Sequence, residues 1–399
     1  MVGSQIMDTP GDDSLSRLVV LRRWFHQNPE LAFKEAETAQ KIIAELERLD
    51  IECEYAGVGH AVIGRIPGCD PEKMAIGLRA EMDALPCTES TGASYVSTNP
   101  GKMHACGHDA HMAMLIGAAE LLSRDPPPGP VNLIFQPAEE SGGGARTAIK
   151  DGALQNVAAI FAGHVTHEYV TGKVMVRDGS VTAQSDRFVI RVRGKGGHGA
   201  RPHEAIDAVI ICGFLITALQ TLVSRETNPL HSVVVTIGRV HAGSAANVIA
   251  EEAELEGSIR TFRPEVRRHI QQGMERMVSA AAELHDAEIH INFAEGYPPV
   301  INEPAATAVA RAAAREIAVN VYVVEAEFPS LGSDDFAYYL ENVRGAFVRF
   351  GSRHMDWEPV PLHSPVFDID ENVLPVGVRF YDRVARLAHE QIEALVNGV

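Results

Sequence analysis

Apolar residues in the first part of the chain follow two alternating patterns, short continuous runs and longer stretches with helical spacing. Helical spacing predicts helices at 15–25 and Glu35–Leu49, and again at Asp109–Leu122 and Ala145–Gln155. The apolar runs predict strands at Ala61–Ile66, Met74–Arg79, Val131–Phe135 and Ala158–Gly163. Strands that alternate with helices are typical of a mostly parallel sheet with helices on both faces, so we expect an α/β fold.

The pattern changes near residue 182, where segments of strictly alternating apolar residues begin. The predicted elements are a strand at Arg187–Val192, a helix at His203–Ser224, strands at Ser232–Val240 and Glu252–Thr261, a helix at Pro264–Leu284 and a strand at Ala287–Phe293. This β-α-β-β-α-β order is the ferredoxin-like pattern. The alternation also implies one buried and one open sheet face.

After residue 295 the α/β rhythm returns, with a helix at Pro304–Ile317, a strand at Ala346–Phe350 and a last helix at Asn372–Val396. We therefore predict a discontinuous larger domain, residues 1–182 and 295–399. A small module, residues 183–294, is inserted into it.

Composition and charge limit the classes of molecule that the protein could bind. The chain has 399 residues, of which 46% are hydrophobic and 22% charged, and its net charge is -18. This charge argues against nucleic acid or an anionic membrane as a partner, but not against a small anionic substrate. The five cysteines are scattered and odd in number, and no apolar run approaches about 18 residues. We expect a cytoplasmic protein with reduced thiols.

The stretch MHACGHDAH at 103–111 gathers a thiol, three imidazoles and a carboxylate. These are ligand types of a zinc-like site. On a helix, Cys106 and His108 would point away from each other, so they converge only if Cys106 lies in a turn, which Gly107 permits. Alternatively, His108 shares one helical stripe with the histidines four residues before and three after it. A buried thiol beside a capped helix is a third interpretation.

Further candidate metal-binding residues follow predicted strands. In open α/β sheets, bound molecules collect at the carboxyl ends of the strands. Glu139 and Glu140 come just after Val131–Phe135, and two adjacent acids could divide the work between binding an ion and moving a proton. His164 ends the next predicted strand, and His363 lies in a turn-rich stretch. Taken singly, the acids could form an exposed loop and each histidine could be structural, but together they favour one site.

Two smaller features complete the set of candidates. Asp83 follows a strand and could orient a metal ligand, or simply begin a turn. In the inserted module, the glycine-rich loop 194–203 places His198 on an exposed backbone, although it lacks phosphate-loop spacing. Asn247 and Arg260 could join it, because an arginine fork matches the two oxygens of a carboxylate. Each of these could equally be a turn residue or a surface charge.

Seven motifs occur in one order along the chain: MHACGHDAHMAMLIG at 103–117, QPAEE at 136–140, GHV at 163–165, the loop 194–203, NVI at 247–249, GSDDF at 332–336 and LHSP at 362–365. Together they resemble the M20 metallopeptidase family, in particular its amidohydrolase branch of hippurate hydrolases, N-acyl-amino-acid deacylases and auxin-conjugate hydrolases. The resemblance spans almost the whole chain. It implies a catalytic domain of zinc-peptidase type with a ferredoxin-like lid that usually dimerises.

The resemblance also assigns roles by motif position. Glu139 resembles the general base. His198, Asn247 and Arg260 resemble substrate-binding residues of the lid, the first two often presented by a partner subunit. The residues that resemble metal ligands are Cys106, His108, Glu140, His164 and His363. Five ligands are few for two ions, and Glu81 stands where the wider family has a histidine ligand.

The implied activity is hydrolysis of an N-acyl amino acid or similar small conjugate, with one or two divalent ions (Zn, Mn, Co or Ni) per subunit in a homodimer or higher homo-oligomer. A dipeptidase or carboxypeptidase is the alternative within the family. A relative that only binds metal or peptide, or a scaffold whose lid only dimerises, is the alternative outside catalysis.

Overall fold

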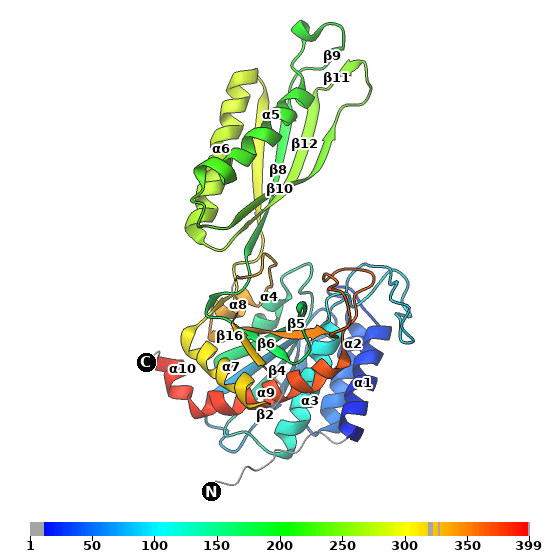
Figure 1. Ribbon diagram of the computed structural model, residues 1–399, viewed down its shortest axis with the longest axis vertical. Helices are drawn as coiled ribbons and strands as arrows, with labels where there is room; N and C mark the ends of the chain where they lie inside the picture. Colours follow the sequence, from blue (N-terminus) through cyan, green and yellow to red (C-terminus); the bar gives the residue numbers. More distant parts are fainter. Residues whose placement is uncertain (1–11, 318–321, 326–327, 398–399) are drawn as a thin grey trace. The chain divides into compact units, whose positions relative to one another are not determined.

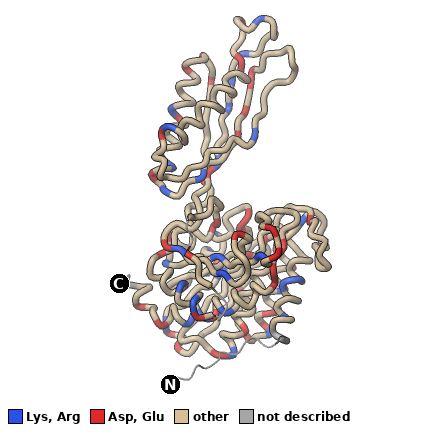
Figure 2. The backbone as a smooth tube through the Cα atoms, viewed as in Figure 1, with Lys and Arg blue, Asp and Glu red and all other residues tan. Residues whose placement is uncertain are grey.

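The computed structural model describes residues 12–317, 322–325 and 328–397, which form two compact units. Unit 1 contains the described residues of Met1–Val181, Ile301–Phe328 and Asp335–Val399. Unit 2 contains Thr182–Val300 and Pro329–Asp334, and its main part is drawn in green and yellow in Figure 1. Among the described residues, Lys and Arg are interspersed with Asp and Glu over both units (Figure 2).

Unit 1 is built on an eight-stranded sheet with the order β1-β2-β4-β3-β5-β16-β6-β15. Its centre is parallel, because β3 pairs in parallel with β4 and β5, and β5 with β16. Strands β3 and β4 are buried along their whole length, as expected for a sheet covered on both faces. The strands are β1 (Glu52–Tyr55), β2 (Val62–Ile66), β3 (Ala75–Glu81), β4 (Val131–Gln136), β5 (Val157–Val170), β6 (Lys173–Val176), β15 (Tyr322–Glu325) and β16 (Arg344–Arg353).

Helices of unit 1 pack against this sheet, with α3 between α1 and α9, and α7 beside α9 (Figure 1). Glycines bring α3 and α9 close together, since a Cβ on Gly117 would lie 2.6 Å from Val378 Cγ2 and one on Gly377 would lie 2.1 Å from Met114 Sδ. The helices are α1 (Asp12–Gln27), α2 (Ala36–Arg48), α3 (His108–Arg124), α4 (Gly144–Lys150), α7 (Pro304–Glu316), α8 (Ala337–Leu340), α9 (Leu374–Glu390) and α10 (Ile392–Asn397). A two-stranded pair, β7 (Gly179–Ser180) and β14 (Ile301–Asn302), adjoins them.

Unit 2 has an antiparallel sheet of order β10-β12-β8-β13 that packs against α5 and α6. This order and the chain order β-α-β-β-α-β are those of a ferredoxin-like module. Its main elements are β8 (Gln184–Arg193), α5 (Ala208–Thr221), β10 (Val233–Ala242), β12 (Glu252–Thr261), α6 (Pro264–His285) and β13 (Glu288–Glu295). A short ribbon of β9 (Gly197–His198) and β11 (Val248–Ile249) joins two of its loops.

Several predicted boundaries are wrong. The helix expected to reach Gln155 ends at Lys150, and the expected last helix is divided into α9 and α10. The strand expected to end at Gly163 continues to Val170, because β5 keeps pairing with β16 after its pairing with β3 has ended. The helix expected from His203 begins at Ala208, because the Asp207 side chain accepts hydrogen bonds from the amides of the first turn.

One helical segment, Ala208–Glu226, is long and apolar enough to cross a membrane by length and composition alone, although the sequence pattern indicated no apolar run of this length. Its Ile211, Leu215 and Leu219 are buried in the core of unit 2, as in a core helix of a soluble domain.

Candidate metal centre

Cys106 lies in the turn before α3, and the helix begins at His108, so the predicted turn is confirmed. Gly107 between them has a φ of 85°, and a Cβ there would lie 2.3 Å from Val165 Cγ2, so only glycine fits. The predicted alternative, one helical histidine stripe, is wrong because His104 precedes the helix. His104 is buried, and neither of its ring nitrogens has a hydrogen-bond partner among the described residues.

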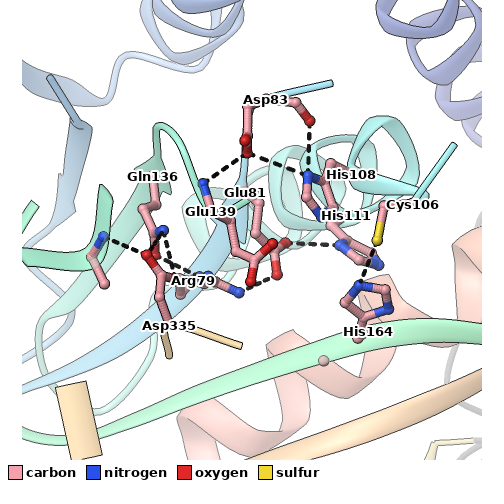
Figure 3. Close-up of polar contacts among 12 residues, drawn as sticks. Arg79, Glu81, Asp83, Cys106, His108, His111, Gln136, Glu139, His164 and Asp335 are labelled. Carbon is pink, nitrogen blue, oxygen red and sulfur yellow. Dashed lines mark hydrogen bonds and ion pairs between the residues drawn. The ribbon is translucent and has the colours of Figure 1, made fainter. Parts of the chain in front are cut away.

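The Cys106 turn sits beside two other candidate ligands. Ligand atoms of Cys106, His108 and Glu140 all lie within 4.8 Å of one another. The Cys106 Sγ is 3.4 Å from Nε2 of His164 (Figure 3). His164 does not end its strand as predicted but lies within β5, two residues beyond Ala162, the last residue of β5 that pairs with β3.

His363 reaches the same place from late in the chain. Its Nε2 lies 3.3 Å from Glu140 Oε1, and that oxygen is 3.9 Å from His108 Nε2. His363 has a φ of 67°, and its amide donates to the Ala105 carbonyl at 2.8 Å, next to the thiol. The structure thus brings together all five residues that the sequence singled out as metal ligands.

The Nε2 atoms of two histidine rings face this point. Nδ1 of His108 lies 2.8 Å from the Asp83 carbonyl and Nδ1 of His164 lies 2.7 Å from the Val165 carbonyl, so each Nδ1 donates its proton there. This leaves Nε2 as the nitrogen that would bind a metal, once His108 has released its second proton. His108 Nε2 and Glu140 Oε1 are buried and make no hydrogen bond among the described residues, and the nearest histidine nitrogen to Oε1 is Nε2 of His363 at 3.3 Å. A divalent cation would satisfy both, and thiolate, imidazole and carboxylate are suitable ligands, so the residues fit a metal.

The electrostatics of these groups also favour a cation. Burial, together with Glu140 and Glu139, raises the pKa of the Cys106 thiol well above its usual range. Burial alone would lower the pKa of His108, but Asp83, Glu81 and Glu140 raise it to about 10. Positive charge is therefore favoured at the His108 ring, and the thiolate needs a cation to form.

Asp83 holds the segment that carries the two adjacent acids. Its Oδ1 accepts the amide of Glu139 at 3.0 Å (Figure 3). Its Oδ2 accepts the amide of Glu140, also at 3.0 Å. Its Oδ1 also lies 3.5 Å from Nδ1 of His108. The orienting carboxylate expected from the sequence is therefore placed to fix both acids and one histidine at once. Glu139 itself is buried.

A second cluster of possible ligands, Glu81 and His111 with His108 and His164, adjoins the first. Nδ1 of His111 lies 2.8 Å from Glu81, and its Nε2 accepts the Val165 amide at 2.9 Å, so both nitrogens are engaged. Glu81 also pairs with the buried Arg79. We therefore assign Glu81 and His111 to supporting the centre rather than to binding the metal.

Sequence reasoning did not identify this supporting network. Arg79 Nη2 lies 2.8 Å from Asp335 Oδ1, and its Nε donates to Gln136 at 2.9 Å (Figure 3). The one signal available was an arginine near the end of an apolar strand, since buried charges in such positions are normally paired.

The candidate residues of unit 2 fall into two places. His198 and Asn247 lie side by side at the β9–β11 ribbon, where the Gly199 amide donates to the Asn247 carbonyl at 2.9 Å. The Ala200 amide donates to His198 Nδ1 at 3.0 Å, which leaves the proton of the neutral ring on the exposed Nε2. Arg260 lies toward the other end of β12, eight residues beyond Glu252 or about 26 Å of strand. It donates to Ser333 Oγ at 3.0 Å.

A thiol, three imidazoles and a carboxylate gathered beside an α/β sheet are the donor set of a metal-dependent enzyme. The family model described as peptidase family M20/M25/M40 matches residues 77–387. The chain belongs to this family, which confirms the resemblance seen in its motifs.

Individual relatives match nearly end to end. The chain is 38% identical to the N-acetyl-L-cysteine deacetylase of Bacillus subtilis, over 96% of this chain and 90% of that protein. It is 38% identical to thermostable carboxypeptidase 2 of Saccharolobus solfataricus, over 90% and 92%. Among solved structures, the Bacillus subtilis YXEP protein, described as a dinuclear metal binding peptidase from the M20 family, matches with a TM-score of 0.82 and 35% identity. That match covers 95% of this chain and 99% of the other.

Proposed function

We propose that this amide-bond hydrolase acts on N-acyl amino acids or similar small conjugates, with Glu139 as the general base. The observation that carries the proposal is the convergence of five potential ligands beside a buried acid that is not one of them. The proposed ligands are Cys106, His108, Glu140, His164 and His363.

The donor set suits one or two divalent ions, Zn, Mn, Co or Ni. When bound, such an ion lowers the pKa of a water molecule and polarises a carbonyl group. The buried Cys106 thiol is within reach of Glu140, His108 and His164, so it would help these residues to hold the metal.

Glu139 would move the proton. Its carboxylate takes a proton from the attacking water and passes it to the leaving amine nitrogen, so one group acts first as base and then as acid. Asp83 fixes the Glu139 amide at 3.0 Å, which holds the base in place without using its side chain.

Residues of unit 2 would bind the substrate. The Nε2–H of His198 is available to the developing oxyanion, a contribution of about 3 kcal/mol for one well-placed donor. Asn247 lies beside it. Arg260, whose pKa is lowered by burial, would hold the carboxylate of the amino acid.

A second copy of the chain follows from the spacing of these residues. Arg260 lies about 26 Å along β12 from Glu252, whereas His198 lies on the β9–β11 ribbon, which precedes Glu252 in the same compact unit. We infer that the two side chains do not reach one small substrate from the same copy of the chain. We therefore propose a homodimer or higher homo-oligomer in which His198 and Asn247 serve the partner's site. Val209, Ile210 and Phe214 of α5, with exposed fractions of 45%, 62% and 43%, offer an apolar face for it.

Mixing two inactive variants tests this arrangement. His198→Ala and Arg260→Ala each remove a residue from every site, but a mixed dimer regains one complete site. Since half of randomly reassorted dimers are mixed, about one quarter of wild-type activity should return. If mixed dimers form but recover no activity, the shared site is refuted.

Glu139→Gln tests the base. Turnover should be abolished while metal content stays at the wild-type level, because the carboxylate is not among the ligands. Near-normal turnover would exclude Glu139 as the base.

A dipeptidase or carboxypeptidase activity is the second candidate, favoured by the likeness to the carboxypeptidase of Saccharolobus solfataricus. A screen of N-acetyl amino acids, N-benzoyl amino acids and dipeptides with Mn, Zn, Co and Ni separates the two. Metal binding without turnover on any substrate would favour a binding-only relative. We also propose a cytoplasmic location, since a thiol ligand needs reducing conditions and the described cysteines are all unpaired.

A further inference from the structure

The segment that carries Glu139 and Glu140 begins in an unfavourable backbone conformation. Ala138 has a φ of 50°, in the left-handed region that non-glycine residues seldom adopt. Such a conformation persists only where its surroundings impose it. The next two amides are held by Asp83, so what holds Ala138 itself decides where the segment starts.

Glu35 provides that hold. Its Oε1 accepts the Ala138 amide at 2.9 Å, across 103 residues of sequence. Glu35 is 1% exposed, and its Oε2 has no hydrogen-bond partner among the described residues. A buried carboxyl group without a paired cation is costly, and burial raises the pKa of Glu35 to about 7, so its presence calls for a role beyond packing.

Glu35 occupies the N-cap position of α2 but does not cap the helix. Its side chain makes no capping hydrogen bond, and the Thr38 amide is instead accepted by Glu30 Oε2 at 2.9 Å. Glu30 thus accepts the hydrogen bond from the first turn that an acidic N-cap residue usually accepts, and the Glu35 side chain points to Ala138 instead.

The same part of the chain contacts the segment a second time. A Cβ on Gly142 would lie 2.3 Å from Cε2 of Phe33, so the ring of Phe33 packs directly on the backbone after Glu140. The turn before α2 therefore meets the acidic segment at both of its ends.

We propose that Glu35 is a positioning residue for the metal centre, which together with Asp83 captures the three consecutive amides of Ala138, Glu139 and Glu140 and so places the base and one metal ligand. The inference rests on the proposed roles of Glu139 and Glu140. Glu35 acts only through the backbone and does not touch substrate or metal.

Substitutions that separate charge, reach and acceptor test the role. Glu35→Gln keeps an oxygen at the same distance, whereas Glu35→Asp keeps the carboxyl group but draws the oxygen away, and Glu35→Leu removes the acceptor. We expect Leu and Asp to weaken Mn²⁺ or Zn²⁺ affinity and to lower kcat about 10- to 100-fold with little change in KM, and Gln to stay within about threefold of wild type. Adding Ala138→Gly to Glu35→Leu should restore part of the loss, since glycine adopts this φ unaided.

The matched control is Glu45→Leu, which removes another buried carboxylate from the same helix, one that pairs with Arg17 and Lys41 instead. It should lower thermal stability but leave metal affinity and kcat unchanged. If Leu and Asp both bind metal as wild type does, or if Gln loses as much as Leu, the proposal is wrong. If Glu35→Leu does not fold, comparing the metal affinities of Glu35→Asp and Glu35→Gln decides the question. Metal affinity is measured without turnover, so this test remains valid even if Glu139 is not the general base.

Discussion

Replacing Asp83 by asparagine should damage the metal centre more than the fold. The change keeps the shape of a buried side chain, but one of its two oxygens becomes an NH₂ group. That group then faces an amide N–H of Glu139 or Glu140 that a carboxylate oxygen now accepts at 3.0 Å. One acceptor is lost and one buried donor is left without a partner.

The expected cost follows from these two losses. A hydrogen bond to a charged group contributes about 1.5–3 kcal/mol, and an unsatisfied buried donor costs about 1–3 kcal/mol. A total of about 3 kcal/mol corresponds to a fall in Tm of roughly 6–12 °C. Because Glu140 lies on the released segment, metal affinity should fall about 10- to 100-fold.

Calorimetric unfolding and metal titration of purified Asp83→Asn measure the two effects separately. Asp151→Asn is the control, since Asp151 also contacts a histidine, His60 at 2.9 Å, and accepts the Ala61 amide at 3.0 Å, but contributes nothing to the metal ligands. It should lower Tm and leave metal affinity alone. If Asp83→Asn loses stability while its metal affinity stays within twofold of wild type, Asp83 only supports the fold and our reasoning is refuted.

Three further predictions concern protons and packing. Metal binding near pH 7 should release about two protons, one from the Cys106 thiol with its raised pKa and one from His108 with a pKa of about 10. Metal affinity should therefore rise with pH. Calorimetry in buffers of different ionisation enthalpy measures the release, and finding none would contradict the prediction. Burial would raise the pKa of Glu89, but hydrogen bonds from His26 and a backbone amide lower it to about 2. The ionised Glu89 therefore stabilises the fold above about pH 4.5, and this contribution is lost toward pH 2. Glu89→Gln should flatten the dependence of Tm on pH in that range, and an unchanged profile would contradict this prediction. Gly144→Ala should prevent metal binding, because the added Cβ would lie 1.6 Å from the Pro137 carbonyl oxygen; a variant with normal metal content would show that the segment can move aside.

Most of the fold could be predicted because burial imposes a simple pattern on the sequence. Strands β3 and β4 are buried throughout and read as continuous apolar runs. Strand β1 was missed because its four residues, ECEY, alternate between exposed and half-buried positions and carry two charges. The end of β5 was missed because the segment THEY at 166–169 is polar and is held by pairing with β16, which no local pattern records.

The candidate ligands could be found because each stands in a recognisable place in the sequence, after an apolar run, in a turn or at the start of a helix. The residues that hold them could not. Glu35 contacts Ala138 across 103 residues, and His111 accepts the Val165 amide across 54. A buried acid at a helix start looks like an ordinary N-cap in sequence, and only the three-dimensional structure shows where its oxygen goes.

The hydrogen bond from His363 to the Ala105 carbonyl has a consequence for biosynthesis. It joins the turn of Cys106 to a part of the chain that is translated 258 residues later, after all of Thr182–Val300. Since domains fold as they emerge from the ribosome, Thr182–Val300 can fold while the centre is still incomplete. A cell depleted of metal during translation should therefore lose little enzyme, provided that metal is supplied once the chain has been released.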